Sequence, residues 1–141
     1  METLPSGLSD IVENEEDLVR FLTSGSQCSA VMVKPSAFIP NPKDRATSVF
    51  RHGRHPTTSL WDIGINQVAG GRTLHGAAIF KAKHVRSALL EVLAQEPPPR
   101  HANITGWPWP EDDPEMGKAE RKERAALIAR HAELVRRTSE V

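Results

Sequence analysis

The pattern of apolar and polar positions predicts a short helix near the start of the chain. Asn14 can cap it, with Asp17 at the fourth place of a capping-box-like arrangement. Residues 18–22 then supply four apolar side chains at helical spacing, and Ser24 with Gly25 ends the element. We therefore expect the first ordered element to be a helix that packs one face on the core.

The pattern near the other end predicts a long helix. Asp113 can cap it, and Pro114 takes the first helical position, where the missing N–H costs nothing. We expect this C-terminal helix to span about 114–137. Residues 118–124 are charged on nearly all sides and should project into solvent or toward a partner. The apolar stripe expected on this helix consists of Leu127, Ile128, Leu134 and Val135.

The middle of the chain contains short strand-like runs separated by proline. Residues 30–33 and 48–51 have strand character. Between them, three prolines within 34–42 exclude a helix or a central strand. Phe38 lies in that segment and should anchor it on the core.

The second half of the middle region is less clear from the pattern. A short helix is expected through residues 60–63, capped by Thr57 or Thr58, and Gly70 with Gly71 should form a turn. Within residues 77–95, the apolar positions from 82 to 93 fit helical spacing, which favours a helix in the second half of this stretch. The alternative is two strands, around 77–80 and around 89–93. Three consecutive prolines at 97–99 end whichever element precedes them.

Together these elements predict an α+β fold, in which short helices and a long C-terminal helix pack on a small, mostly antiparallel sheet. The chain has 141 residues and is 38% hydrophobic, enough for one domain with its own core. We expect residues 1–12 to be a flexible N-terminus and residues 13–138 to form the single domain.

Charge and cysteine content narrow the class of protein. Eighteen Lys and Arg balance eighteen Asp and Glu, which does not favour nucleic acid as a partner. The balance is local, however, because residues 1–17 carry six acids while residues 34–100 carry ten bases against four acids. The single Cys28 gives no disulfide and no cysteine-based metal site. No apolar run suits a membrane span, so we expect a cytoplasmic protein with no metal and no cofactor.

The segment 99–110 has the most unusual composition, with two Trp-Pro pairs next to a histidine. His101 could serve as a general acid or base, with Asn103 orienting a substrate. Trp107 and the prolines could rim a ligand pocket or a peptide groove. The alternative is that the segment only closes the core as a rigid buckle.

Several basic side chains extend this list of candidate binding residues. Lys34 and Arg51, like Arg20, stand at the ends of expected elements, where cations often face a cleft. Together with Arg100, Lys34 and Arg51 could bind phosphate. Phe38, which lies near Lys34 in the sequence, is a further aromatic candidate for the binding site beside Trp107.

Five segments resemble an uncharacterised family of small bacterial proteins. They cover most of residues 15–135, and the resemblance implies a bacterial cytoplasmic protein with a strand, not a helix, at 89–95. The prolines at 97–99 and Trp109 depart from the family pattern. The five segments are 18–22, 34–40 (KPSAFIP), 48–51 (SVFR), 60–64 (LWDIG) and 100–108 (RHANITGWP).

Two classes of function remain open from the sequence. The first is a small binding or interaction module for a protein partner or a small anionic ligand, with self-association through the C-terminal helix as one route. The second is an enzyme acting on a nucleotide or nucleic acid, with His101 as acid/base and with Lys34 and Arg51 binding phosphate. The absence of phosphate-loop, dinucleotide-binding and nucleophile-elbow motifs favours the first class.

Overall fold

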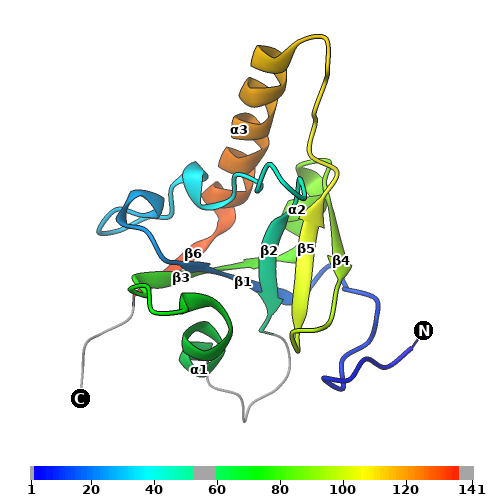
Figure 1. The fold of residues 1–141 in the computed structure, drawn as a ribbon, viewed down its shortest axis with the longest axis vertical. Helices are drawn as coiled ribbons and strands as arrows, with labels where there is room; N and C mark the ends of the chain where they lie inside the picture. The colour runs from blue at the N-terminus through cyan, green and yellow to red at the C-terminus, as the bar shows by residue number, and fades with distance from the viewer. Residues whose placement is uncertain (1, 53–59, 137–141) are drawn as a thin grey trace.

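The fold is built on one six-stranded sheet, seen in the computed structural model, which describes residues 2–52 and 60–136 (Figure 1). Every neighbouring pair is antiparallel, in the order β4-β5-β2-β1-β3-β6. The strands are β1 (Asp17–Leu22), β2 (Thr47–Arg51), β3 (Gly76–Lys81), β4 (Glu91–Ala94), β5 (His101–Thr105) and β6 (Glu133–Arg136). The predicted α+β class with a mostly antiparallel sheet is confirmed.

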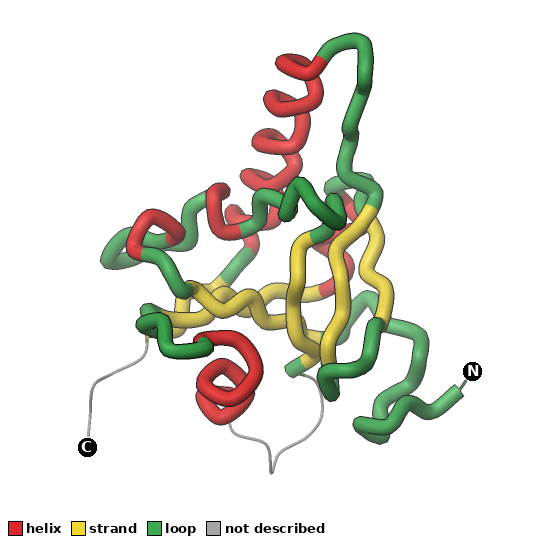
Figure 2. Tube along the Cα trace, in the orientation of Figure 1, coloured by secondary structure: helices red, strands yellow, loops and turns green. Residues whose placement is uncertain are grey.

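The helices are short, apart from one (Figure 2). The long one, α3, follows the cap and proline that predict its start, because the Asp113 side chain accepts a hydrogen bond from the backbone N–H of Met116. The short helix expected at 60–63 is also present, while its expected caps, Thr57 and Thr58, lie outside the described residues. The helical elements are η1 (Gly25–Gln27), η2 (Pro35–Ala37), α1 (Leu60–Ile63), the π-helix η3 (Gly64–Ala69), α2 (Ala82–Ser87) and α3 (Pro114–His131).

The sheet turns sharply between β1 and β2, so that β1, β3 and β6 cross the direction of β2, β5 and β4 (Figure 1). The main core lies on the side of the sheet that faces α2, α3 and η2. A smaller core on the other side is covered by α1 and η3. The middle of the sheet is therefore buried on both faces.

This double burial explains why the helix expected through residues 18–22 is wrong. Those residues form strand β1, in which Leu18 and Leu22 face the main core while Val19 and Phe21 face the smaller one. A strand buried on both faces has a nearly continuous apolar run, and here its spacing coincides with that of a helix.

The strand expected at residues 30–33 is also wrong. The Ser29 hydroxyl accepts hydrogen bonds from the backbone N–H groups of Val31 and Met32, which folds the segment into a turn. The side chains of Val31 and Met32 are exposed as a result. Only a single bridge, from Cys28 to Val33, has strand-like pairing.

The helix favoured in the second half of residues 77–95 is mostly wrong, because only Ala82–Ser87 is helical. Helix α2 stops after Ser87, and Leu89 then adopts a φ of 63°, which no helix accommodates. The chain reverses there and continues as β4, paired with β5. The two-strand alternative, with strands near 77–80 and 89–93, describes the sheet better.

The C-terminal helix is shorter than the expected 114–137. It ends at His131, and Glu133–Arg136 forms β6 against β3. The pairing is close, because a Cβ on Gly76 would lie 2.9 Å from the backbone oxygen of Val135. Tertiary pairing with this glycine-containing strand overrides the helix preference of the terminal residues.

Candidate functional site

The structure distributes the predicted binding residues over four places. Phe38 and Trp107 lie in the main core, Arg51 and Arg100 in a buried polar network, His101 and Asn103 on the sheet face turned away from the main core, and Lys34 in a surface groove.

The two aromatic candidates are structural. Phe38 is fully buried and meets the ring of Phe80 edge-on, with centroids 5.2 Å apart. Trp107 is 7% exposed, and its indole N–H donates to the backbone oxygen of Ile104 at 3.1 Å. Trp107 therefore seals the core, as the buckle alternative for this segment expects.

Arg51 is 1% exposed and is held by the chain's own N-terminal part. Its guanidinium pairs with the Glu16 carboxylate, with Nη2 2.9 Å from Oε1, and the two groups also share a second hydrogen bond. Further donors reach the backbone oxygens of Ser9 and Ile11. A buried cation needs this degree of pairing, because desolvation otherwise outweighs its interactions.

Arg100 completes the buried network beside Arg51. It adopts a φ of 70°, and its guanidinium donates to the backbone oxygens of Arg51, at 2.8 Å, and of His52. Burial, and next the neighbouring Arg51 charge, lower the pKa of Arg100. These two arginines join the end of β2 to its surroundings. The structure does not bring Lys34, Arg51 and His101 into one cavity.

One hollow in the surface is a groove of about 530 Å³ between the 34–42 segment and α3. Its floor is apolar and its rim is cationic. We call it the cationic groove. Its lining residues are Lys34, Pro35, Ser36, Ile39, Pro40, Pro42, Trp109, Lys118, Arg121 and Lys122.

A glycine in α3 allows the Trp-Pro segment to reach this groove. A Cβ on Gly117 would lie 2.7 Å from Cδ of Pro110, so only glycine lets Pro110 press against the helix. Trp109 then stacks on the guanidinium of Arg121, whose Cζ lies 3.8 Å from the ring centroid. Arg121 also donates to the backbone oxygen of Pro108 at 3.0 Å, which fixes the stack.

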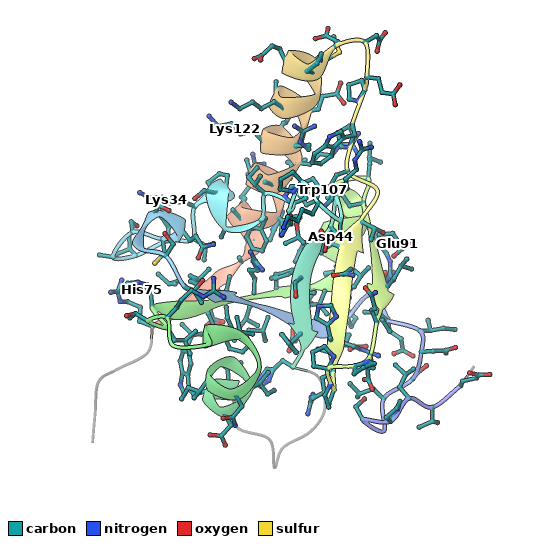
Figure 3. All side chains as sticks on the ribbon, viewed as in Figure 1. Lys34, Asp44, His75, Glu91, Trp107 and Lys122 are labelled. Carbon is teal, nitrogen blue, oxygen red and sulfur yellow. The ribbon has the colours of Figure 1, made fainter. Side chains whose placement is uncertain are left out.

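The groove carries uncompensated positive charge. Lys34 and Lys122, labelled in Figure 3, come from the η2 segment and from α3, and Lys118 adds a third ammonium group. None of the three forms an ion pair with another residue that the structure describes. The described lining contains no carboxylate. The groove therefore combines three ammonium groups on its rim with an apolar floor.

The apolar side of α3 is used inside the domain. Ile128 is fully buried, and Leu127 packs partly buried against the main core. Leu134 and Val135, expected on the same helical stripe, lie on β6 instead. The expected apolar stripe is thus not an exposed surface, and the cationic side of α3 is the side that faces the groove.

A second hollow, of about 480 Å³, lies over β2 and β5 on the face turned away from the main core. In it the Ser48 hydroxyl lies 2.7 Å from Nε2 of His101, and Nδ1 of His101 lies 2.9 Å from the backbone oxygen of Gln95. Asn103 donates from its amide to the Gln95 side chain. We call it the Ser48 hollow. Its lining residues are Asp44, Ala46, Ser48, Gln95, Pro97, His101, Asn103 and Thr105.

Sequence reasoning missed most of the groove lining, including Trp109, Lys118, Arg121 and Lys122, and it missed Ser48. A signal for the helix residues exists, because Lys118, Arg121 and Lys122 stand three and four positions apart and so share one helical face. Trp109 could not be distinguished from Trp107, since each precedes a proline. Ser48 gives no signal until β2 is placed beside β5.

Other candidate features contribute no site. Cys28 is half-buried and packs against the main core. Among the described residues, no three His, Cys, Asp or Glu side chains gather as metal ligands would. No helix in the described part of the chain has both the length and the apolar composition that crossing a bilayer requires. No known protein family, curated protein or solved structure matches the chain.

Proposed function

We propose that this protein is a binding module whose cationic groove holds an extended, acidic segment of a protein partner. The observation that carries the proposal is the combination of an apolar floor with three ammonium groups on its rim that form no ion pair within the described part of the chain. The buried arginines, Arg51 and Arg100, and the apolar side of α3 make their contacts within the domain and stabilise it. In the groove, by contrast, the ammonium groups of Lys34, Lys118 and Lys122 form no ion pair with any residue that the structure describes.

The chemistry of the lining favours a peptide over a bare anion. Trp109, Ile39 and the three groove prolines present rigid apolar surface, which loses little conformational entropy when covered. A phosphate or sulfate ion would leave this floor exposed to water. An extended peptide that alternates acidic and apolar or proline residues covers the floor and pairs the rim at the same time.

The rim should act mainly on specificity and on association rate. Solvent-exposed ion pairs contribute about 0.2–1 kcal/mol each, so the lysines alone do not hold the partner. A cluster of one sign steers an oppositely charged segment toward the groove, and salt weakens that steering. The affinity itself should depend on Trp109 and on the apolar floor.

A selection from a phage-displayed library of random peptides tests the proposal. We expect the protein to enrich peptides that combine Asp or Glu with proline or aromatic residues. The double variant K118E/K122E should lose about tenfold or more in affinity for them, which corresponds to about 1.4 kcal/mol. The matched control is K43E/R130E, which makes the same change in net charge at exposed residues that do not line the groove.

Two results would contradict the proposal. One is that the selected peptides bind K118E/K122E as tightly as the unaltered protein, or that K43E/R130E weakens their binding equally. The other is that inorganic pyrophosphate displaces the peptides at a concentration similar to theirs. The second result would make the groove a small-anion site and not a peptide site.

A further inference from the structure

The Ser48 hollow contains the hydrogen-bond chain of an activated serine. The Ser48 hydroxyl and Nε2 of His101 are 2.7 Å apart, and Nδ1 of the same ring is 2.9 Å from the backbone oxygen of Gln95. A nucleophile, a base within hydrogen-bond reach and a third group that orients the base are the three parts that covalent catalysis requires. Here the third part is a backbone carbonyl.

The chain of hydrogen bonds fixes the form of the imidazole. A carbonyl oxygen can only accept a hydrogen bond. Nδ1 of His101 must therefore carry the proton and donate the hydrogen bond to the backbone oxygen of Gln95. In the neutral ring Nε2 is then the acceptor, and the Ser48 hydroxyl donates to it. This is the arrangement in which histidine can remove the hydroxyl proton as the oxygen attacks.

Rigid strands hold the two side chains in place. Ser48 lies on β2 and His101 on β5, in the register Ser48↔Asn103 and Phe50↔His101. The Phe50 ring packs edge-on against the imidazole, with centroids 5.4 Å apart. The side chain of Arg20 donates to the backbone oxygen of Ser48 at 2.8 Å, which holds β2 at this point.

Asn103 is placed to stabilise an oxyanion. As the cross-strand partner of Ser48, it has its Cβ about 4.5–5.5 Å from that of the serine. Its amide nitrogen carries two hydrogens, of which the hydrogen bond to the Gln95 side chain uses one. The other can donate to an oxygen that becomes negative on a carbonyl attached to Ser48.

The charge of the hollow indicates the class of substrate. Asp44 is the acidic member of its described lining, which contains no lysine and no arginine. A carboxylate substrate would be repelled there, in contrast to the cationic groove. The hollow suits a small uncharged ester.

We propose that Ser48 is an acylatable nucleophile and that the Ser48 hollow hydrolyses small uncharged esters, independently of the groove. The Ser48 oxygen attacks the ester carbonyl carbon while its proton passes to Nε2 of His101. The bond from the carbonyl carbon to the alkoxy oxygen then breaks, and Nε2 returns the proton to the departing alcohol. Water, deprotonated by the same imidazole, hydrolyses the acyl-serine and releases the carboxylic acid, and the serine oxygen regains its proton.

A fluorophosphonate probe tests the nucleophile directly, because the serine oxygen displaces fluoride and keeps the phosphonyl group. Intact mass followed by peptide mapping should place one adduct on Ser48 and none on Ser36. Ser36 is an exposed serine whose hydroxyl donates to the backbone oxygen of Ser26 and contacts no histidine among the described residues, so it serves as an internal control. Ser48→Ala should abolish the adduct.

The role of His101 is tested with His101→Gln and His101→Asn. In each variant whose melting temperature is unchanged, we expect the rate of labelling at Ser48 to fall about 10²-fold or more. An unlabelled Ser48 in the unaltered protein, equal labelling of Ser36, or a labelling rate unaffected in both folded histidine variants would overturn the proposal. A measured turnover of p-nitrophenyl acetate that persists in Ser48→Ala would overturn the esterase step.

Discussion

The two faces of the Trp-Pro segment 107–110 show how one local sequence can serve two purposes. Trp107 is 7% exposed, and its N–H bonds to the backbone of Ile104. Trp109, two residues on and likewise followed by proline, is half-buried against Arg121 in the cationic groove. The segment therefore seals the core with one indole and lines the cationic groove with the other.

The difference comes from what each ring meets and not from its immediate neighbours in sequence. Trp107 follows directly from β5 and packs on the apolar side of the sheet. Trp109 meets α3, whose facing side carries cations, and a planar guanidinium is a good partner for an aromatic ring. Burial of an aromatic residue is thus decided by the element that lies opposite it.

The largest expected effect separates the two tryptophans by stability. Trp107→Ala should lower the free energy of unfolding by about 3–5 kcal/mol, because it leaves a large cavity in the core. Trp109→Ala should lower it by no more than about 1 kcal/mol, yet weaken binding of the selected peptides about tenfold. Urea unfolding and peptide titration measure the two quantities.

Phenylalanine at each position tests how much of the effect depends on keeping an aromatic ring. Trp107→Phe should recover part of the stability, while Trp109→Phe should recover part of the affinity. If Trp109→Ala proves as destabilising as Trp107→Ala, then both rings are structural and the division between the two faces is wrong.

A smaller effect is expected at the glycine that lets the segment approach α3. Gly117→Ala should cost about 1–3 kcal/mol, because its Cβ would overlap Pro110, although alanine normally favours a helix. Gly25→Ala is the control, since a Cβ there meets nothing within 4 Å. The displaced Pro110 should also weaken peptide binding. A stabilised Gly117→Ala protein would show that Pro110 does not press on the helix.

The smallest effect concerns the far end of α3, where His131 stacks on His84 with centroids 4.1 Å apart. Desolvation, and next the His131 charge, lower the pKa of His84. Below the usual histidine pKa of about 6.5 the unfolded chain binds a proton that the folded chain resists, so stability should fall as the pH drops from there. The other charged groups that affect His84 are Lys83, Glu15 and Lys81.

Melting temperatures across this pH range check the last prediction. We expect the decline below about pH 6.5 to be shallower in His84→Gln than in the unaltered protein. Over this pH range the free energy of peptide binding at the groove should change less than the free energy of local opening at the end of α3. Amide exchange measures the second quantity. Identical declines in the two proteins would show that the stacked pair does not affect the pH dependence.

The fold class follows from the sequence because it depends on local signals that the structure preserves. The cap at Asp113 with Pro114 starts α3 as expected, and the run 48–51 becomes β2. The errors arise where tertiary contacts decide. Residues 18–22 look helical because both faces of β1 are buried, and Glu133–Arg136 becomes β6 because a strand edge is available beside Gly76.

The candidate sites were harder to predict, since each depends on pairs that are distant in sequence. Arginine is a residue type that often binds anionic ligands, and in the sequence Arg51 is a candidate for that reason. Only its pairing with Glu16, 35 residues earlier, shows that it is structural. Ser48 becomes chemically notable only beside His101, 53 residues later. The register of an antiparallel sheet, which creates such pairs, is not encoded in either residue alone.

The environment of Trp109 has a consequence for spectroscopy. The chain contains three tryptophans and no tyrosine, so its near-ultraviolet emission comes from indole rings alone. Trp107 is sealed and Trp61 packs on the smaller core, which leaves Trp109 as the indole beside an open, positively charged surface. Iodide, an anionic quencher, should concentrate there and quench the fluorescence of Trp109 before that of the other indoles. The quenching of Trp109 therefore reports whether the groove is occupied.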